Sequence, residues 1–438
     1  MIIIKEAYKE IQMRLGCQNY KEDNAFHVSV FVVKESTPKG DLLYNTLTGE
    51  IILTESEDDA QELKKKWYYI SNENDEFLVL EKLRKQLIDS EISDAISTYT
   101  IFPTTDCNAS CYYCFEEGRK KKNMNKATAV KVAAYISGKC KNNEVTIRWF
   151  GGEPLVNKMA IDIVCSLLKE KDISFTSKMV TNGFLFSKSN IEKACKNWHL
   201  TQVQITIDGT ESQYNKIKNY NCSKDINPFC KVLNNIDLLT SKGVYVIIRL
   251  NVCLDNIADQ INLCKTVLLT RFKNNNQISI YSHLLLESLV SGTVCEHKKL
   301  FGQKEILDDL IYNNGFSCHN KASTKFKLYR CVSDNKKSVT ILPNGEIGLC
   351  EHYSDNHFVT HIDSSSPINS GEVNFLRARL PKLELCSDCS FYPFCIRLKC
   401  CPEHGTCTPE LKGQYIRNLH RELIAEYESY LHKMEIQP

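Results

Sequence analysis

Between residues 99 and 286, short apolar runs alternate with longer amphipathic runs. The pattern predicts six strands, at 99–105, 144–150, 174–181, 201–208, 244–252 and 277–285. It predicts helices between them, at 126–137, 158–169, 189–198, 228–241 and 255–270. Connections of this length suit parallel strands joined by right-handed crossovers. We therefore expect an α/β fold with a partial (β/α)6 barrel, whose functional residues lie in the loops that follow the strands.

Three cysteines, Cys107, Cys111 and Cys114, follow the first predicted strand in one short loop. Thiolates suit iron–sulfur clusters, copper(I) and zinc, and this loop supplies three of them without a fourth. Three ligands leave one metal position open, where chemistry can occur. Because the loop lies at the predicted functional rim, the pattern favours a reactive metal centre over a zinc loop.

The spacing of these cysteines, with Tyr113 before the last, resembles the signature of radical S-adenosylmethionine (SAM) enzymes. The resemblance implies a [4Fe–4S] cluster held by the three thiolates, with SAM bound at its open iron. The second strand ends in Gly151, Gly152, Glu153 and Pro154, which match the family motif that holds the SAM amino group. The resemblance also places polar groups from the later strands around the SAM ribose and carboxylate: Asn182, Thr206, Asp208, Arg249 and Asn251.

The chain departs from the family pattern after Asp208. The family often has a His and then an Arg, where this sequence has Tyr214 and Lys218. Lys218 keeps the charge but loses the guanidinium fork, so the sequence assigns it no role.

The last third of the chain is rich in cysteine and poor in long periodic elements, so we expect it to depend on bound metal to fold. Its spacing resembles the SPASM extension of radical SAM enzymes, which implies two auxiliary [4Fe–4S] clusters. By that resemblance the outer cluster takes Cys386, Cys389, Cys395 and Cys407. A zinc ribbon is the alternative, because Cys-x2-Cys pairs bind zinc readily.

The inner auxiliary cluster would take Cys331, Cys350 and either Cys400 or Cys401, of which we favour Cys401 because Pro402 follows it. Its fourth ligand stays open between Cys318 and a substrate thiolate at an open iron. Glu351 follows Cys350 directly. In sulfatase-maturing relatives an acid at this position takes a proton from the substrate, so Glu351 is the candidate catalytic base. An exposed surface glutamate is the alternative.

The first part of the chain predicts a small α+β unit. Strands are expected at 26–33, 41–45 and 49–54, and helices at 58–67 and 77–88. This order resembles a RiPP recognition element, the winged-helix module that binds the leader of a ribosomally made, post-translationally modified peptide by adding it as a strand. We expect three domains: 1–97, 98–310 and 311–438. Helices are expected at 304–313 and, closing the chain, at 410–433.

Charge and cysteine usage narrow the function classes. Lys and Arg number 55 against 53 Asp and Glu, so no bulk charge favours nucleic acid or an anionic membrane. The apolar start is only three residues long and no run approaches a bilayer span, so neither a signal peptide nor a membrane protein is expected. We expect a cytoplasmic protein whose 21 cysteines serve metal binding rather than disulfides.

The resemblance implies a peptide maturase. A 5′-deoxyadenosyl radical would abstract hydrogen from a ribosomal precursor peptide, and a thioether or C–C crosslink would form. An external donor such as flavodoxin or ferredoxin would supply the electron. One alternative is a sulfatase maturase that makes formylglycine. Another, from a different class, is a non-catalytic iron–sulfur or zinc regulator, but Gly151 to Pro154 and the polar rim argue against it because a binding module needs no SAM pocket.

Overall fold

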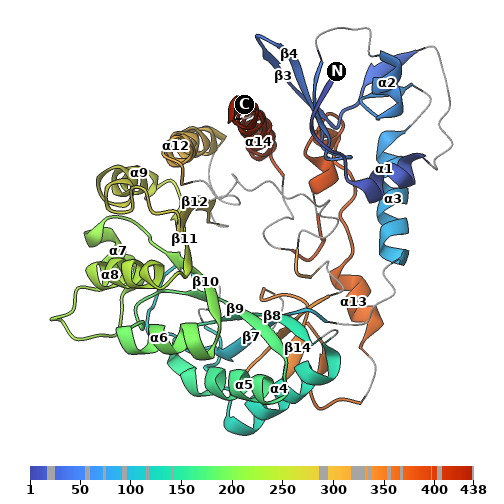
Figure 1. Ribbon diagram of the computed structural model, residues 1–438. Helices are drawn as coiled ribbons and strands as arrows, with labels where there is room; N and C mark the ends of the chain where they lie inside the picture. Colours follow the sequence, from blue (N-terminus) through green and yellow to red (C-terminus); the bar gives the residue numbers. More distant parts are fainter. Residues whose placement is uncertain are drawn as a thin grey trace.

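The computed structural model describes residues 1–16, 25–54, 60–72, 75–90, 96–114, 116, 118–140, 143–285, 294–316, 331–333, 337–352, 357–365, 368–395, 397–401 and 407–436. A curved central sheet is covered on one side by helices, and a small N-terminal unit packs beside the C-terminal helix (Figure 1). No helix within these ranges is both long and apolar enough to cross a membrane.

Six parallel strands form the centre of the sheet, as the sequence predicts. They are β7 (Thr98–Thr104), β8 (Glu144–Gly151), β9 (Ser174–Thr181), β10 (Leu200–Thr206), β11 (Tyr245–Val252) and β12 (Ile278–Leu284). The helices on its outer side are α4 (Lys126–Lys139), α5 (Lys158–Glu170), α6 (Lys188–Asn197), α8 (Pro228–Ser241) and α9 (Ile257–Leu263), which continues through a π turn (Cys264–Leu268) into α10 (Leu269–Arg271).

Burial alternates along these strands, because successive side chains point to opposite faces. In β8, Val145, Ile147 and Trp149 are buried in the core under the helices, whereas Arg148 and Phe150 are only half-buried. The sheet therefore packs one face against α4, α5, α6 and α8, whereas within the described residues no helix covers the opposite face, which we call the helix-free face. The loops after the strands meet at one edge of this second face.

The C-terminal part extends the same sheet. Strand β13 (Ser338–Ile341) pairs in parallel with β7, and β14 (Glu346–Gly348) and β15 (Phe358–His361) follow in antiparallel order. A hairpin turn lies between β13 and β14. Its Gly345 has φ +90°, and a Cβ there would lie 2.7 Å from Ile362 Cδ1, so only glycine fits.

The N-terminal unit is an antiparallel sheet in the order β1 (Ile2–Lys5), β5 (Ile51–Thr54), β4 (Gly40–Asn45), β3 (Val32–Thr37). A second pair, β2 (Phe26–Val28) and β6 (Tyr69–Ser71), and helices α1 (Lys9–Gly16), α2 (Ala60–Lys65) and α3 (Glu76–Ser90) complete it. The single strand predicted at 26–33 is wrong. The chain turns at Ser29 because the Glu76 carboxylate accepts hydrogen bonds from Ser29 Oγ and from the Val30 amide, the latter at 3.1 Å.

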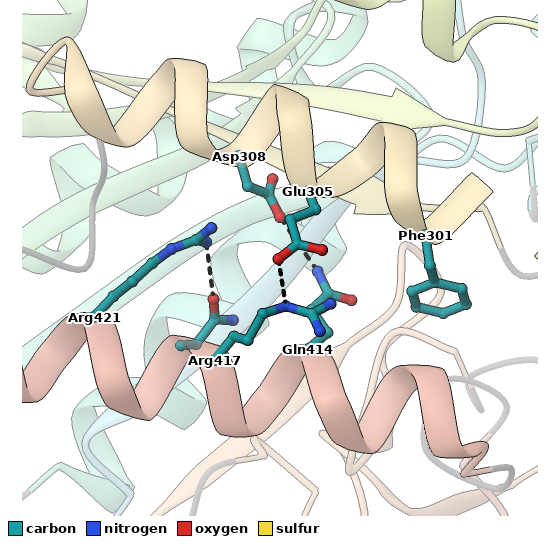
Figure 2. A pocket seen from close by; sticks show the side chains of 7 residues that line it. Phe301, Glu305, Asp308, Gln414, Arg417 and Arg421 are labelled. Atoms are coloured by element: carbon teal, nitrogen blue, oxygen red, sulfur yellow. Dashed lines mark hydrogen bonds and ion pairs between the residues drawn. The ribbon is translucent and has the colours of Figure 1, made fainter. Parts of the chain in front are cut away.

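The closing helix α14 (Pro409–Ile436) joins the N-terminal unit to the barrel. Leu419 and Leu423 pack with Val33 and Leu42 of the N-terminal sheet. Figure 2 shows the other side of α14, which meets α12 (Val294–Asn313) through polar groups. There Arg417 Nε lies 3.0 Å from a Glu305 carboxylate oxygen. Shorter elements are α7 (Glu211–Lys218), α13 (Ser370–Leu376) and 3-10 turns at Pro154–Asn157, Glu384–Cys386 and Tyr392–Phe394.

Candidate active site

The three-cysteine loop lies directly after β7, at the edge where the sheet carries its polar loops. Cys107, Cys111 and Cys114 are all half-buried free thiols, and they are close enough to raise one another's pKa. Cys107 Sγ accepts hydrogen bonds from the Ala109 amide at 3.4 Å and from Asn182 Nδ2 at 3.7 Å. Burial raises the pKa of Cys107 to about 12, and burial also raises the pKa of Cys111 and of Cys114.

High thiol pKa values describe sulfurs that ionise only against a strong positive charge, and a bound metal supplies such a charge. Among the described residues, no group of three or more His, Cys, Asp and Glu side chains is already arranged around a metal position. The donor set of the loop nevertheless fits an iron–sulfur cluster with one open iron, because three soft ligands stand together at the functional edge.

Gly151 and Gly152 pack under the cysteine loop. A Cβ on Gly151, which has φ +118°, would lie 2.1 Å from the Thr104 carbonyl oxygen, and a Cβ on Gly152 would lie 2.3 Å from that of Asp106. The Glu153 amide donates to the same Asp106 carbonyl at 2.9 Å. In the sequence, these glycines match the motif that holds the SAM amino group. The structure adds that their first neighbour is the backbone that carries the cysteines.

Glu153 ties the ends of β8 and β9 together. Its fully buried carboxylate accepts hydrogen bonds from Thr181 Oγ1 at 2.9 Å, from the Asn182 amide at 2.8 Å and from the Leu155 amide at 3.1 Å. Burial raises its pKa to about 7. Pro154 is buried and starts the 3-10 turn. Asn182 in turn donates to Asn108 Oδ1 at 2.8 Å, so the loops after β7, β8 and β9 form one network.

A second network surrounds Asp208, which is fully buried. It pairs with Lys218 Nζ at 2.7 Å and accepts a hydrogen bond from the Tyr113 hydroxyl at 2.6 Å. Asn251 Nδ2 donates to Asp208 at 3.1 Å. Burial opposes the charge on Lys218, but the Asp208 carboxylate, together with Tyr113 and Cys111, outweighs burial and holds the pKa of Lys218 well above its ordinary value.

Lys218 is a site residue to which the sequence analysis assigned no role. Its Nζ also donates to Thr206 Oγ1 at 2.8 Å and to the Tyr113 hydroxyl at 3.0 Å. Arg249 Nε donates to Asn251 Oδ1 at 2.8 Å. The structure therefore brings Thr206, Asp208, Arg249 and Asn251 together and places Lys218 among them. The sequence did contain a hint of this position, because Lys218 stands where the family often has Arg. Its contact with Tyr113, however, is visible only in the folded structure.

Lys218 is held there by the end of α7, a helix that the sequence analysis missed. The Lys218 carbonyl accepts from the Ser110 amide at 2.9 Å, and the Asn221 amide donates to the Asn108 carbonyl at 3.0 Å. Asn219 makes the turn between them with φ +43°. The cysteine loop is thus bound by backbone hydrogen bonds to the segment that carries Lys218.

Seven described cysteines of the last third fall into two sets whose members influence one another electrostatically. Cys386, Cys389, Cys395 and Cys407 influence one another electrostatically, and burial raises the pKa of Cys395 to about 11. In the other set, burial raises the pKa of Cys350, and the thiols of Cys331 and Cys401 add to that rise. Cys400 Sγ instead contacts the Phe375 carbonyl oxygen at 3.8 Å. Cys318 lies outside the described residues.

Glu351 faces the barrel. One of its carboxylate oxygens lies 3.9 Å from Arg148 of β8, and the other accepts from Cys350 Sγ at 3.7 Å. Its side chain is only 14% exposed, so it is not a freely solvated surface residue. The residue after the inner cysteine thus lies next to the helix-free face of the sheet.

Comparison with known proteins agrees with this geometry. Residues 101–260 match the model of the Radical SAM superfamily. A probable GTP 3′,8-cyclase of Methanocaldococcus jannaschii is 27% identical over 176 residues, which are 39% of this chain and 56% of the relative. The radical SAM cyclopropyl synthase TigE of Paramaledivibacter caminithermalis is 26% identical over 235 residues, 47% of this chain and 49% of the relative. The matched segments thus span only about half the length of these relatives.

Solved structures share the fold. Native anSMEcpe with bound AdoMet aligns with a TM-score of 0.55 at 16% identity, over 76% of this chain and 98% of that chain. Streptococcus suis SuiB bound to the precursor peptide SuiA aligns with a TM-score of 0.50 at 15% identity, over 87% and 98%. Together with the family match over residues 101–260, these findings show that the chain has a radical SAM fold and carries a radical SAM domain.

Proposed function

We propose that this protein is a radical SAM enzyme that abstracts hydrogen from a ribosomally made precursor peptide and installs a thioether or C–C crosslink. The observation that carries the proposal is the cysteine loop after β7, bound through Tyr113 and the 218–221 segment to the Asp208–Lys218 pair. Cys107, Cys111 and Cys114 would hold the [4Fe–4S] cluster. When bound with SAM, that cluster supplies a 5′-deoxyadenosyl radical.

The remaining site residues would bind SAM and the substrate and hold the loops around them in place. The Thr206, Asp208, Lys218 and Asn251 network fixes the loop ends on the SAM side. Asn251 holds Arg249, whose remaining guanidinium N–H groups would bind the SAM carboxylate. Glu351 accepts a proton from the substrate at its carboxylate, because it is shielded from bulk water and lies beside the sheet face.

The auxiliary ligands that we propose follow the two observed sets. Cys386, Cys389, Cys395 and Cys407 would hold the outer cluster. Cys331, Cys350 and Cys401 would hold the inner cluster, because Cys401 shares the surroundings of Cys350 and Cys400 contacts Phe375 instead. The open inner position would then receive Cys318 or a substrate thiolate.

Peptide modification is supported by the proteins that this chain resembles and by the N-terminal unit. SuiB, which shares the fold, is bound to a precursor peptide in its solved structure. In this chain β3 is an edge strand of the N-terminal sheet, and an edge strand can receive a leader as an added strand. Residues 1–97 would therefore bind the leader.

An acidic electron donor, such as a flavodoxin or ferredoxin, fits the surface beside the cysteine loop. Arg119, Lys120 and Lys122 line an open pocket there with Thr105 and Pro343. A cluster of positive charge next to the redox loop would steer an acidic partner toward it.

Anaerobic reconstitution and SAM cleavage test the proposal. Wild type should produce 5′-deoxyadenosine from SAM when reduced, and the triple variant with Cys107, Cys111 and Cys114 changed to Ala should produce none while auxiliary-cluster absorbance survives. Deoxyadenosine formed by the triple variant would show that the site is misplaced. Formylglycine in place of a crosslink would support the second candidate, a sulfatase-maturase-like oxidation, which Glu351 beside Cys350 favours.

A further inference from the structure

The helix-free face of the barrel sheet carries two cations side by side. Arg148 of β8 and Lys178 of β9 are register partners in the parallel ladder, and both are half-buried on the face opposite to the helix-covered core. Neighbouring strands lie roughly 4.8 Å apart, so the two side chains start from adjacent positions. Like charges at adjacent positions of a sheet are destabilising unless an anion lies between them.

The described residues provide only one negatively charged side chain near this pair of cations. Glu351, 3.9 Å from Arg148, is the one carboxylate within 4.0 Å of either cation among the described residues. The Arg148 side chain makes no hydrogen bond with any described residue, and the Lys178 side chain makes neither a hydrogen bond nor an ion pair with one. Most of the Arg148 guanidinium fork and all three Lys178 donors are therefore available to a ligand.

The neighbourhood of the pair is open and polar. Thr176, two residues before Lys178 on the same face, is exposed, and Thr146 on the same face of β8 is half-buried. Glu351 connects this region to the Cys350 set, since its carboxylate accepts from Cys350 Sγ. An anion bound by Arg148 and Lys178 would thus lie between the barrel and the proposed inner cluster.

We infer that Arg148 and Lys178 form a carboxylate-binding subsite, which receives an acidic side chain of the peptide near the residue that reacts. The inference rests on the proposed function. A carboxylate matches the planar guanidinium fork and carries a single negative charge. A phosphate group carries more negative charge and would be repelled more strongly by Glu351 at the same site.

Binding of labelled peptides tests this inference without turnover. Two fluorescein-labelled twelve-residue Gly/Ser peptides would be compared by anisotropy at low salt, one with four Glu and one with four Gln in their place. We expect the Glu peptide to bind wild type at least tenfold more tightly. The double variant Arg148→Gln, Lys178→Gln should lose that tenfold difference, and Arg148→Lys should keep part of it.

The matched control removes two exposed lysines from the outer helices, as Lys158→Gln with Lys188→Gln. This control should bind the Glu peptide as tightly as wild type does. If it loses affinity as much as the double variant, bulk charge explains the effect and the subsite is overturned. Amidating the C-terminus of the Glu peptide should change nothing, whereas loss of binding would identify a terminal carboxylate as the ligand and overturn the side-chain assignment. Equal binding of the Glu and Gln peptides would also overturn it.

Competition with GTP tests the alternative that Arg148 and Lys178 bind a small phosphate-containing molecule instead of a peptide. Displacement of the Glu peptide by GTP in wild type, together with GTP affinity that is lost in the double variant, would overturn the peptide assignment. Iron content and deoxyadenosine production, measured in the same preparations, should stay near wild type in the double variant. Their loss in wild type itself would count against the proposed function rather than against the subsite.

Discussion

At the scale of single residues, the site depends on buried charges that stabilise one another. Asp208 and Lys218 are almost completely shielded from solvent, with side chains 0% and 3% exposed. Removing one partner of such a pair leaves the other charge buried and unpaired. Replacing Lys218 therefore tests the pair directly.

We expect Lys218→Met to lower the free energy of unfolding by roughly 3–5 kcal/mol, the usual cost of stranding a buried charge. SAM affinity should fall as well, because Tyr113 and Thr206 lose the donor that holds them. Urea unfolding and isothermal titration with SAM measure the two effects. The double variant with Asp208→Asn should recover part of the stability, and no recovery would mean that the pair is not coupled.

Glu153 makes stability depend on pH. Burial raises its pKa to about 7 from an ordinary 4.5, so the native state holds this proton more tightly than the unfolded state does. Its contribution is complete below pH 4.5 and is lost as the pH rises through 7. Relative to Glu153→Gln, wild type should therefore lose about 3 kcal/mol between pH 4.5 and pH 8. Urea unfolding at several pH values checks this, and a pH-independent difference between the two proteins would contradict it.

Gly152 tests how closely the motif packs under the cysteine loop. A Cβ at this position would lie 2.3 Å from one backbone oxygen and 2.6 Å from the carbonyl carbon of Asp106, and the backbone cannot step aside as a flexible side chain can. Gly152→Ala should therefore shift the loop and reduce iron retention at Cys107, Cys111 and Cys114. Gly138→Ala, at a position with open space around its Cβ, is the matched control. Wild-type iron content in Gly152→Ala would contradict the packing argument.

At the scale of secondary-structure elements, the sequence predicted those strands and helices whose apolar residues recur with a regular local period. Strand β9 and helix α8 were predicted at their observed bounds because each shows a regular pattern between clear turn signals. Helix α7 was missed because its eight residues carry a weak apolar pattern. The break at Ser29 could not be predicted, since it is made by Glu76, which lies far along the chain.

The same division holds for the site. Cysteine spacing and strand ends make Cys107, Asp208 and Asn251 candidates, because functional residues of a parallel barrel lie in the loops at one end of its strands. The contact of Lys218 with Tyr113 and the adjacency of Arg148 and Lys178 arise only when strand register and loop packing are known.

At the scale of the whole molecule, the N-terminal unit is fastened to the proposed outer cluster segment. Arg84 of α3, almost fully buried, donates to the carbonyl oxygens of Tyr392, Pro393 and Cys395 at 3.2, 3.1 and 3.3 Å. Thr46 Oγ1 donates to the Ser390 carbonyl at 2.6 Å. A module for leader binding alone would not require contacts to the backbone beside a cluster ligand.

Deleting residues 1–97 should therefore do more than remove leader binding. We expect the truncated protein to lose peptide modification and also about four of roughly twelve irons, those of the outer [4Fe–4S] cluster. Arg84→Gln should weaken the outer cluster selectively, with Lys85→Gln, on the exposed side of the same helix, as the control. Iron analysis and electron paramagnetic resonance measure this, and full iron content in the truncated protein would show that the contacts are dispensable.

The pairing of β13 with β7 has a consequence for synthesis on the ribosome. Strand β7 opens the barrel, yet one of its two edges is covered by residues 338–341, which emerge long after residues 98–104. Until then a nascent or prematurely terminated chain exposes an unpaired β edge beside free thiols, and such edges recruit other chains. Fragments that end before β13 should therefore aggregate. Chaperones and proteases would first encounter this chain as a barrel in which one edge of β7 is unpaired.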